Sequence, residues 1–202
     1  MRGVEFYYDL VSPYSYLAHG RVGRICEEHG AELVLRPMLL GGVHKAVGIR
    51  APIEIPAKGR YQVRDIKRWV EHYGLPMRFP EPFPFRTLKT MRAAMWCDMQ
   101  GRDPAGFVRE AFTLYWEEGG APKGTEEADE DGPLREVARR IGAYPEGLLE
   151  GASKPETKQA LKDATGEALE RGVFGAPAFF VGEEMFWGND RLFFVEETLK
   201  RA

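Results

Sequence analysis

The stretch Tyr8-Asp9-Leu10-Val11-Ser12-Pro13-Tyr14-Ser15-Tyr16 marks the point at which a strand ends and a helix begins. Residues 4–8, which lead into it, form an apolar and aromatic run typical of a short strand. Beyond Pro13 the apolar residues recur at helical spacing, and Gly30 stands where a glycine commonly ends a helix. That helical stripe consists of Leu17, Val22, Ile25 and Cys26. Residues 33–35 predict a second strand, so the chain opens as strand, helix, strand.

The end of the chain predicts two more strands and a helix. Residues 178–181 and 185–187 are apolar runs joined by a Gly-Glu turn, which is the pattern of a β-hairpin. A last helix is expected from about Arg191 to Lys200. Strand–helix–strand at the start and hairpin–helix at the end is the order of a thioredoxin-type α/β sheet.

The middle of the chain is helical, apart from two segments. Residues 41–59, rich in Gly, Ala and Pro, are expected to be extended or loop, and the prolines of 76–84 forbid regular helix. Helical patterns are expected around residues 63–73, 88–99, 108–115, 133–142 and 156–171. We therefore expect a thioredoxin-like domain of residues 1–58 and 172–202 with an inserted all-helical domain, 59–171, whose last helix could instead pack on the sheet. The acidic run 126–131 is expected to be a solvated surface loop without function.

Composition excludes several classes of protein. The 202 residues carry a net charge of −3 and are 44% apolar, which is ordinary for a globular protein and indicates neither a nucleic-acid nor a membrane partner. No signal peptide and no apolar stretch of the ~18 residues that span a bilayer is expected. Cys26 and Cys97 are far apart and form no Cys-x-x-Cys, which argues against a metal site and against dithiol chemistry. Two buried thiols in a reduced cytoplasm are expected.

Ser12 is the first candidate for chemistry. Its plain interpretation is an N-cap, with Pro13 at the first helical position. A helix N-terminus also stabilises anions, and thiols at such ends have pKa values lowered from about 8.5 to ~3.5–7.5. Because Ser12 has no thiol, its hydroxyl would donate a hydrogen bond to a thiolate of a ligand such as glutathione, worth ~1.5–3 kcal/mol.

Two further motifs flank the hairpin. Pro177, in Gly175-Ala176-Pro177, is either an ordinary strand start or a cis-proline, the form of only about 5–6% of X–Pro bonds. After the hairpin, Asn189 or Asp190 is expected to cap the last helix. That helix N-terminus could also bind the charged end of a peptide ligand.

Together these motifs resemble a known family. The Ser-Pro-Tyr-Ser of residues 12–15 resembles the Cys-Pro-x-Cys of DsbA-type oxidoreductases, with serine in both cysteine positions. Its frame is similar to that of 2-hydroxychromene-2-carboxylate isomerases and kappa-class glutathione transferases, and residues 173–177 and 185–192 match as well. The resemblance runs from about residue 4 to 198 and is weak in the helical middle. It implies a DsbA/kappa-type thioredoxin fold, an enzyme that uses glutathione, and a cytoplasmic homodimer.

The resemblance also implies roles for single residues toward glutathione. Ser12 would hold its sulfur, and Ala176, beside a cis Pro177, would pair with its backbone as in β-addition. The γ-glutamyl end, with its ammonium facing Asp190, would be held by Trp187, Gly188, Asn189 and Asp190.

The implied reaction interconverts a hydroxychromene carboxylate and a trans-benzylidenepyruvate by reversible addition of a thiolate. The substrate carboxylate would meet His44, Lys45 and Arg50, in the loop where the isomerases carry a substrate-binding lysine; ordinary solvated charges are the alternative. Ungapped alignment to Gly48 puts His44 at the lysine position. Ile49 stands where both families usually have asparagine, and residues 52–56 lack the asparagine–arginine pair of the isomerases. The glutathione half of the reaction is thus better supported than the isomerase half.

Three functions follow from this sequence. The first is a glutathione-dependent isomerase of an aromatic carboxylate. The second is a kappa-like transferase, which would consume glutathione. The third is a non-catalytic thioredoxin-like binding protein. A dithiol–disulfide enzyme is excluded, because neither Ser12 nor Ser15 can form a disulfide.

Overall fold

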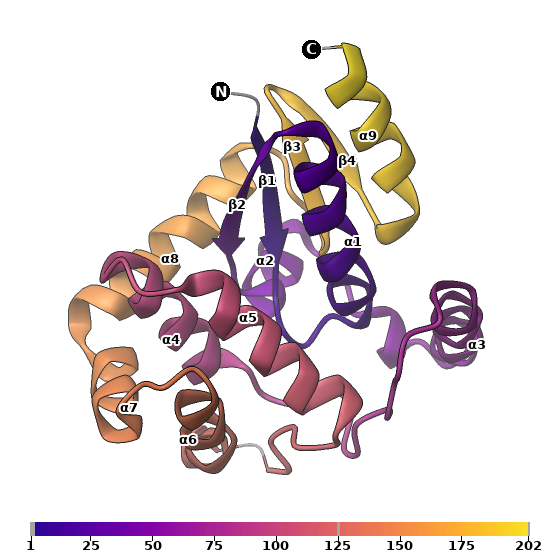
Figure 1. Cartoon of the computed structure of the whole chain (residues 1–202). Helices are drawn as coiled ribbons and strands as arrows, with labels where there is room; N and C mark the ends of the chain where they lie inside the picture. Colours follow the sequence, from indigo (N-terminus) through magenta and orange to yellow (C-terminus); the bar gives the residue numbers. More distant parts are fainter. Residues whose placement is uncertain (1–2, 125, 202) are drawn as a thin grey trace.

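A four-stranded mixed sheet lies at the centre of the computed structural model, which describes residues 3–124 and 126–201 (Figure 1). Its strands are β1 (Gly3–Tyr8), β2 (Glu32–Pro37), β3 (Ala178–Val181) and β4 (Glu184–Trp187). The order is β2-β1-β3-β4, with β1 and β2 parallel and β3 antiparallel to both β1 and β4. The expected thioredoxin-type sheet is confirmed.

Helices cover both faces of this sheet (Figure 1). Side chains alternate along β1, so neighbouring residues pack against helices on opposite faces. Phe6 is fully buried and stacks on Phe179 of β3, with ring centroids 5.1 Å apart, on the face covered by α1 (Pro13–His29) and α9 (Leu192–Arg201). Tyr7 points to the opposite face, where α2 (Leu40–Val47) and α8 (Pro155–Glu170) pack.

The ends of α1 form as the sequence predicts. Ser12 is the N-cap, and its Oγ accepts a hydrogen bond from Ser15 N at 3.2 Å. Gly30 ends the helix in the left-handed conformation, with φ +60°, which a glycine adopts without strain. Ser12 therefore sits at the boundary between the sheet and the first helix.

The expectation that residues 41–59 are extended or loop is wrong. The segment contains α2, a short 3-10 helix (Pro52–Glu54) and the first turn of α3 (Pro56–Tyr73). Tertiary contacts hold the start of α2: Leu40 N donates to Asp9 Oδ2 at 2.9 Å, and Leu39 N donates to Thr165 Oγ1 at 3.1 Å. These partners satisfy N–H groups that a glycine-rich helix cannot satisfy by itself.

The middle of the chain forms the expected helices and one more. They are α4 (Leu88–Met99), α5 (Pro104–Phe112) continued by a π-helical turn (Thr113–Glu117), α6 (Asp131–Arg140) and the unpredicted α7 (Pro145–Ser153). Helix α4 contacts α5, α7 and α8, whereas α3 lies against α1 and α8 also packs on β2. The division into a sheet domain and an insertion, 59–171, stays a prediction. No helix in the described ranges is both long and apolar enough to span a membrane.

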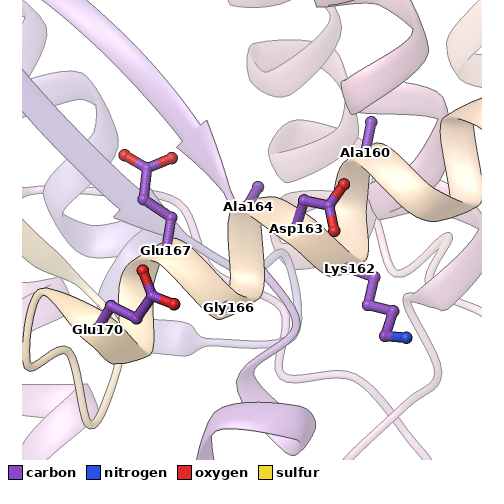
Figure 2. Close-up of a pocket in the computed structure, with 7 residues that line it drawn as sticks. All are labelled: Ala160, Lys162, Asp163, Ala164, Gly166, Glu167 and Glu170. Atoms are coloured by element: carbon purple, nitrogen blue, oxygen red, sulfur yellow. The ribbon is translucent and has the colours of Figure 1, made fainter.

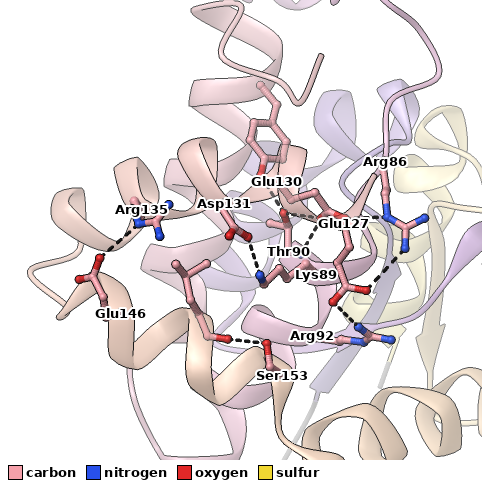
Figure 3. Close-up of polar contacts among 12 residues, drawn as sticks. Arg86, Lys89, Thr90, Arg92, Glu127, Glu130, Asp131, Arg135, Glu146 and Ser153 are labelled. Carbon is pink, nitrogen blue, oxygen red and sulfur yellow. Dashed lines mark hydrogen bonds and ion pairs between the residues drawn. The ribbon is translucent and has the colours of Figure 1, made fainter. Parts of the chain in front are cut away.

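The acidic run 126–131 is only in part the solvated loop that the sequence suggests: Glu126 and Asp129 are exposed. Residues Glu127–Glu130 form a 3-10 helix, and Glu130 is fully buried. Its Oε2 accepts hydrogen bonds from Thr90 N at 2.9 Å and Thr90 Oγ1 at 3.0 Å (Figure 3). Thr90 of α4 thus satisfies one oxygen of this buried carboxylate, and the charge of Arg86, whose Nε lies 3.2 Å from Oε1, offsets the burial of the other.

Candidate functional site

A cavity of about 1320 Å³ opens beside the end of β1. Its walls come from the N-terminus of α1, from α2 and α3, from residues 83–88, and from the loops on either side of the hairpin. All ten residues that the sequence singles out line it: Ser12, His44, Lys45, Arg50, Ala176, Pro177, Trp187, Gly188, Asn189 and Asp190. Small-molecule pockets usually measure about 300–1,000 Å³, so this cavity is larger than most.

Ser12 and Ala176, 164 residues apart, meet in this cavity. The side chain of Ser12 is buried, with the residue 3% exposed, and its Oγ donates to Ala176 O at 3.1 Å. The Ala176–Pro177 peptide bond is cis, as the resemblance implies. A hydroxyl has one proton, so Ser12 can donate to a ligand only after rotating away from Ala176 O.

The backbone around Ala176 is free on one side. Within the described ranges, no backbone hydrogen bond is donated by Ala176 N, whereas Pro177 O accepts one from Gly188 N at 3.0 Å. Gly175 is required here, because a Cβ at this position would lie 2.6 Å from the indole Nε1 of Trp187. Trp187 packs on Phe174, with ring centroids 4.8 Å apart, so its half-exposed indole lies against this loop.

The expected N-cap at Asn189 or Asp190 is not present. A 3-10 turn (Asn189–Arg191) starts after Gly188, and no side chain caps it. Asn189 is buried, and its Nδ2 lies 3.5 Å from Tyr73 Oη. Asp190 is ion-paired with Arg191 at the cavity surface. The two polar groups are therefore directed to side chains and to the cavity rather than to helix N–H groups.

The three residues expected to bind the substrate carboxylate, His44, Lys45 and Arg50, lie near Ile49 at the exposed edge of the cavity, which we call the rim. Burial lowers the pKa of His44, so its ring is neutral at neutral pH. Lys45 is exposed, and the side chain of Arg50 is 74% exposed and 3.6 Å from Glu54. The neighbouring Ile49 also lines the cavity. None of the three is fixed by a buried partner in the described structure.

Asp9 is a site residue that the sequence analysis left without a role. Its buried carboxylate accepts three hydrogen bonds, from Val11 N at 3.1 Å, Leu40 N at 2.9 Å and Thr87 Oγ1 at 2.7 Å. Burial raises its pKa, while the three donors oppose that shift. The position of Asp9 between a buried strand and a helix cap could have pointed to a role in the site. Its partners Leu40 and Thr87, however, lie 31 and 78 residues away in the sequence.

One face of α3 forms another wall, which the sequence analysis also missed. Tyr14 Oη donates to Asp65 Oδ2 at 2.9 Å, and burial together with Asp65 raises the pKa of Tyr14, which therefore stays protonated. Gln62, buried on the same wall, has an Oε1 without a hydrogen-bond partner in the described structure.

The π-helical turn supports the Ser12 loop from behind. Trp116, fully buried, donates from Nε1 to Leu10 O at 2.9 Å. Such turns inside helices are often found next to functional sites. This contact ties the helical middle of the chain to the stretch between β1 and α1.

The cysteines and a second hollow stand apart from this site. Burial raises the pKa of Cys26 to about 11 and that of Cys97 to about 12, so neither supplies a thiolate. The described residues contain no cluster of three His, Cys, Asp or Glu side chains that could hold a metal ion. A hollow of about 620 Å³ along α8 is lined by that helix alone (Figure 2) and contains none of the expected site residues.

Known proteins with the same fold and similar sequence bear on this geometry. A family model described as a DSBA-like thioredoxin domain matches residues 3–200. A 2-hydroxychromene-2-carboxylate isomerase of Sphingobium xenophagum is 33% identical over 97% of each chain. Glutathione S-transferase kappa 1 of Homo sapiens is 30% identical over 95% of this chain and 88% of its own. The solved structure of a 2-hydroxychromene-2-carboxylate isomerase has a TM-score of 0.85 at 28% identity, over 98% of this chain and 95% of that one.

These relatives are isomerases and glutathione transferases, which supports an enzymatic function for the cavity. Their similarity spans the whole described chain, including the helical middle. The chain belongs to the family of DsbA-like thioredoxin domains, in the group that contains 2-hydroxychromene-2-carboxylate isomerases and kappa-class glutathione transferases.

Proposed function

We propose that this chain is a glutathione-dependent isomerase that interconverts 2-hydroxychromene-2-carboxylate-like and trans-benzylidenepyruvate-like compounds. The observation that carries the proposal is the 3.1 Å contact between Ser12 Oγ and Ala176 O, at the N-terminus of α1 and beside a cis Pro177. The isomerases among the relatives support the reaction, and the kappa-class transferases support the use of glutathione.

The residues around this contact fit a tripeptide thiol. Ala176 N, without a backbone partner in the described structure, can pair with an extended peptide. Ser12 can turn its hydroxyl toward a sulfur, in the positive potential of the α1 N-terminus. Trp187, Gly188 and Asn189 would hold the γ-glutamyl end, with Asp190 toward its ammonium. When bound, glutathione supplies a thiolate that adds reversibly to a conjugated double bond and so permits rotation about it.

The residues of the chain would stabilise this thiolate and bind the substrate. Ser12 stabilises the thiolate, so the nucleophile is ionised near neutral pH. Lys45 and Arg50 attract the substrate carboxylate to the rim, and the neutral His44 donates a hydrogen bond there. Ile49 contributes an apolar contact where the two families usually have an amide.

The test is calorimetric titration of glutathione into the wild type, Ser12→Ala and Ser15→Ala. Ser15 is the matched control, because it is the same residue type in the same motif and its buried Oγ has no partner in the described structure. We expect Ser12→Ala to raise the Kd by about 10- to 100-fold, the value of one charge-assisted hydrogen bond. Ser15→Ala should bind as the wild type does.

An ultraviolet assay with 2-hydroxychromene-2-carboxylate completes the test. Turnover of many substrate molecules per added glutathione, with free glutathione unchanged at the end, is the expected result. Binding with stoichiometric loss of glutathione would favour a kappa-like transferase, which the human relative supports. Failure of the wild type to bind glutathione would contradict the proposal and favour a non-catalytic binding protein. The homodimer and the cytoplasmic location remain part of the proposal, to be checked by sedimentation and fractionation.

A further inference from the structure

A short strip of chain before α4, Phe83-Pro84-Phe85-Arg86-Thr87, forms one wall of the cavity. Thr87 fixes its end by the 2.7 Å hydrogen bond to Asp9. Phe83 and Phe85 both pack on the buried Trp116, with ring centroids 5.8 and 5.6 Å from it. The strip therefore presents two held aromatic rings and, next to them, the guanidinium of Arg86.

The guanidinium of Arg86 is held by ion pairs with two glutamates, without a hydrogen bond to either of them. Its Nε lies 3.2 Å from Glu130 Oε1, and Nη2 lies 3.8 Å from Glu127 Oε2. Among the described residues it forms no hydrogen bond of good geometry, and both Arg86 Nε and Glu130 Oε1 are buried without a partner. Figure 3 shows one terminal nitrogen directed toward Glu127 and the other directed away from both carboxylates.

The carboxylates behind Arg86 are fixed. Glu130 is anchored by two hydrogen bonds from Thr90, whose Oγ1 also contacts Tyr115 Oη at 2.8 Å. Glu127 is shared with Arg92, at 2.9 Å from Nη1. The network contains three cations and three carboxylates: Arg86, Lys89, Arg92, Glu127, Glu130 and Asp131 (Figure 3). Its net charge is zero, so an anion would be bound by oriented donors rather than by excess charge.

Arg86 differs in this respect from the cations at the rim. Its side chain is 33% exposed, against 74% for Arg50, and Lys45 is also exposed. A partly buried guanidinium loses less freedom on binding, and its terminal nitrogen that is directed away from both carboxylates can donate a charge-assisted hydrogen bond to a carboxylate. Beside it, the rings of Phe83 and Phe85 offer an apolar surface to a flat aromatic group.

We propose that Arg86 binds the carboxylate of an aromatic substrate while Phe83 and Phe85 contact its ring. This inference deepens the proposed isomerase function and assigns the specificity for aromatic carboxylates to the 83–87 strip. Lys45 and Arg50 then attract the anion to the mouth of the cavity, and Arg86 orients it inside.

The test uses an unreactive probe, 2-naphthoate, with its neutral analogue 2-naphthamide. Binding of both is measured by calorimetry for the wild type, Arg86→Gln, Arg86→Lys and Arg92→Gln. Arg92 is the matched control, because it pairs with the same Glu127 but does not line the cavity. We expect Arg86→Gln to weaken 2-naphthoate binding at least tenfold, Arg86→Lys to weaken it less, and 2-naphthamide and glutathione binding to stay unchanged.

Arg86→Gln leaves Glu130 as a buried charge without its cation, which could unfold the protein. The double variant Arg86→Gln/Glu130→Gln removes both charges and should lose 2-naphthoate binding to the same extent. Unchanged 2-naphthoate binding in this folded double variant, or a larger loss in Lys45→Gln or Arg50→Gln, would overturn the inference. So would a wild type that does not bind the probe at all.

Two experimental outcomes separate the role of Arg86 from the isomerase reaction. Arg86-dependent binding of 2-naphthoate by a wild type without isomerase turnover contradicts the proposed reaction alone. Isomerase turnover with a KM that does not rise in Arg86→Gln contradicts the role of Arg86 alone.

Discussion

The two ends of the cavity are built differently. At the Ser12 end the side chains are buried and hydrogen-bonded: Ser12 to Ala176, Asp9 to three donors, and Trp116 to Leu10. At the rim near Ile49 most side chains are exposed, and Arg50 forms an exposed ion pair with Glu54. A rigid end suits an invariable ligand such as a thiol cofactor, whereas a loose rim can change its substrate by single substitutions. Four substitutions test this contrast.

Asp9→Ala should have the largest effect, because the Asp9 carboxylate accepts hydrogen bonds from three separate segments of the chain. Three buried donors would lose their acceptor, so we expect the free energy of unfolding to fall by about 2–4 kcal/mol. For a domain of this size that lowers the Tm by roughly 5–15 °C, measured by calorimetric scanning. Asp163→Ala on the exposed side of α8 is the control and should leave the Tm unchanged. A Tm for Asp9→Ala close to that of the wild type would show that the rigid end has another origin.

Trp116→Phe should loosen the Ser12 end most, because Phe83 and Phe85 can still pack on the ring that replaces the indole. It removes the donor to Leu10 O, which is worth about 1 kcal/mol, or roughly 2–4 °C in Tm. Trp96→Phe is the matched control, because the buried Nε1 of Trp96 has no partner in the described structure. Glutathione affinity should fall in Trp116→Phe by a larger factor than the KM for the carboxylate substrate rises. A change in the KM for the carboxylate substrate without a change in glutathione affinity would show that Trp116 supports the substrate end of the cavity rather than the Ser12 end.

Gly175→Ala should act on the loop proposed to bind glutathione, with only a small loss of stability. The new Cβ would lie 2.6 Å from Trp187 Nε1, so the half-exposed indole must move. Moving it costs about 1 kcal/mol, and glutathione should bind several-fold more weakly in calorimetry. The control is Gly166→Ala on α8, where a Cβ meets nothing within 4 Å. Wild-type affinity in Gly175→Ala would mean that Trp187 does not contact the cofactor.

His44→Gln should have the smallest effect and tests the rim. Because burial lowers the pKa of His44 below its ordinary value of 6.5, the ring is neutral from that pH upward. The KM for a carboxylate substrate should therefore be flat between about pH 6.5 and 8. His44→Gln should have the same profile, since both side chains are neutral donors. A wild-type KM that falls as the pH drops through this window, but not in His44→Gln, would show that a charged imidazole binds the substrate.

Most of the candidate site could be expected from the sequence because its parts lie in local motifs that resemble those of a known family. Ser12 caps a helix whose first turn is adjacent in the chain, Ala176 precedes the hairpin, and Trp187 is its last residue. The residues missed are those defined by distant partners. Asp9 and Thr87 are 78 residues apart, and Arg86 depends on Glu130, which the sequence placed on the surface.

The sequence by itself determined the strands, most of the helices and the Ser12 and Gly30 ends of α1. These features follow from apolar periodicity and from hydrogen bonds within a few residues. Only the tertiary structure decided that the glycine-rich segment after β2 becomes α2, that Glu130 is buried, and that Arg86 lines the cavity. Each of these depends on a partner supplied by another element, since a buried N–H or charge is stable only where the fold brings a matching group to it.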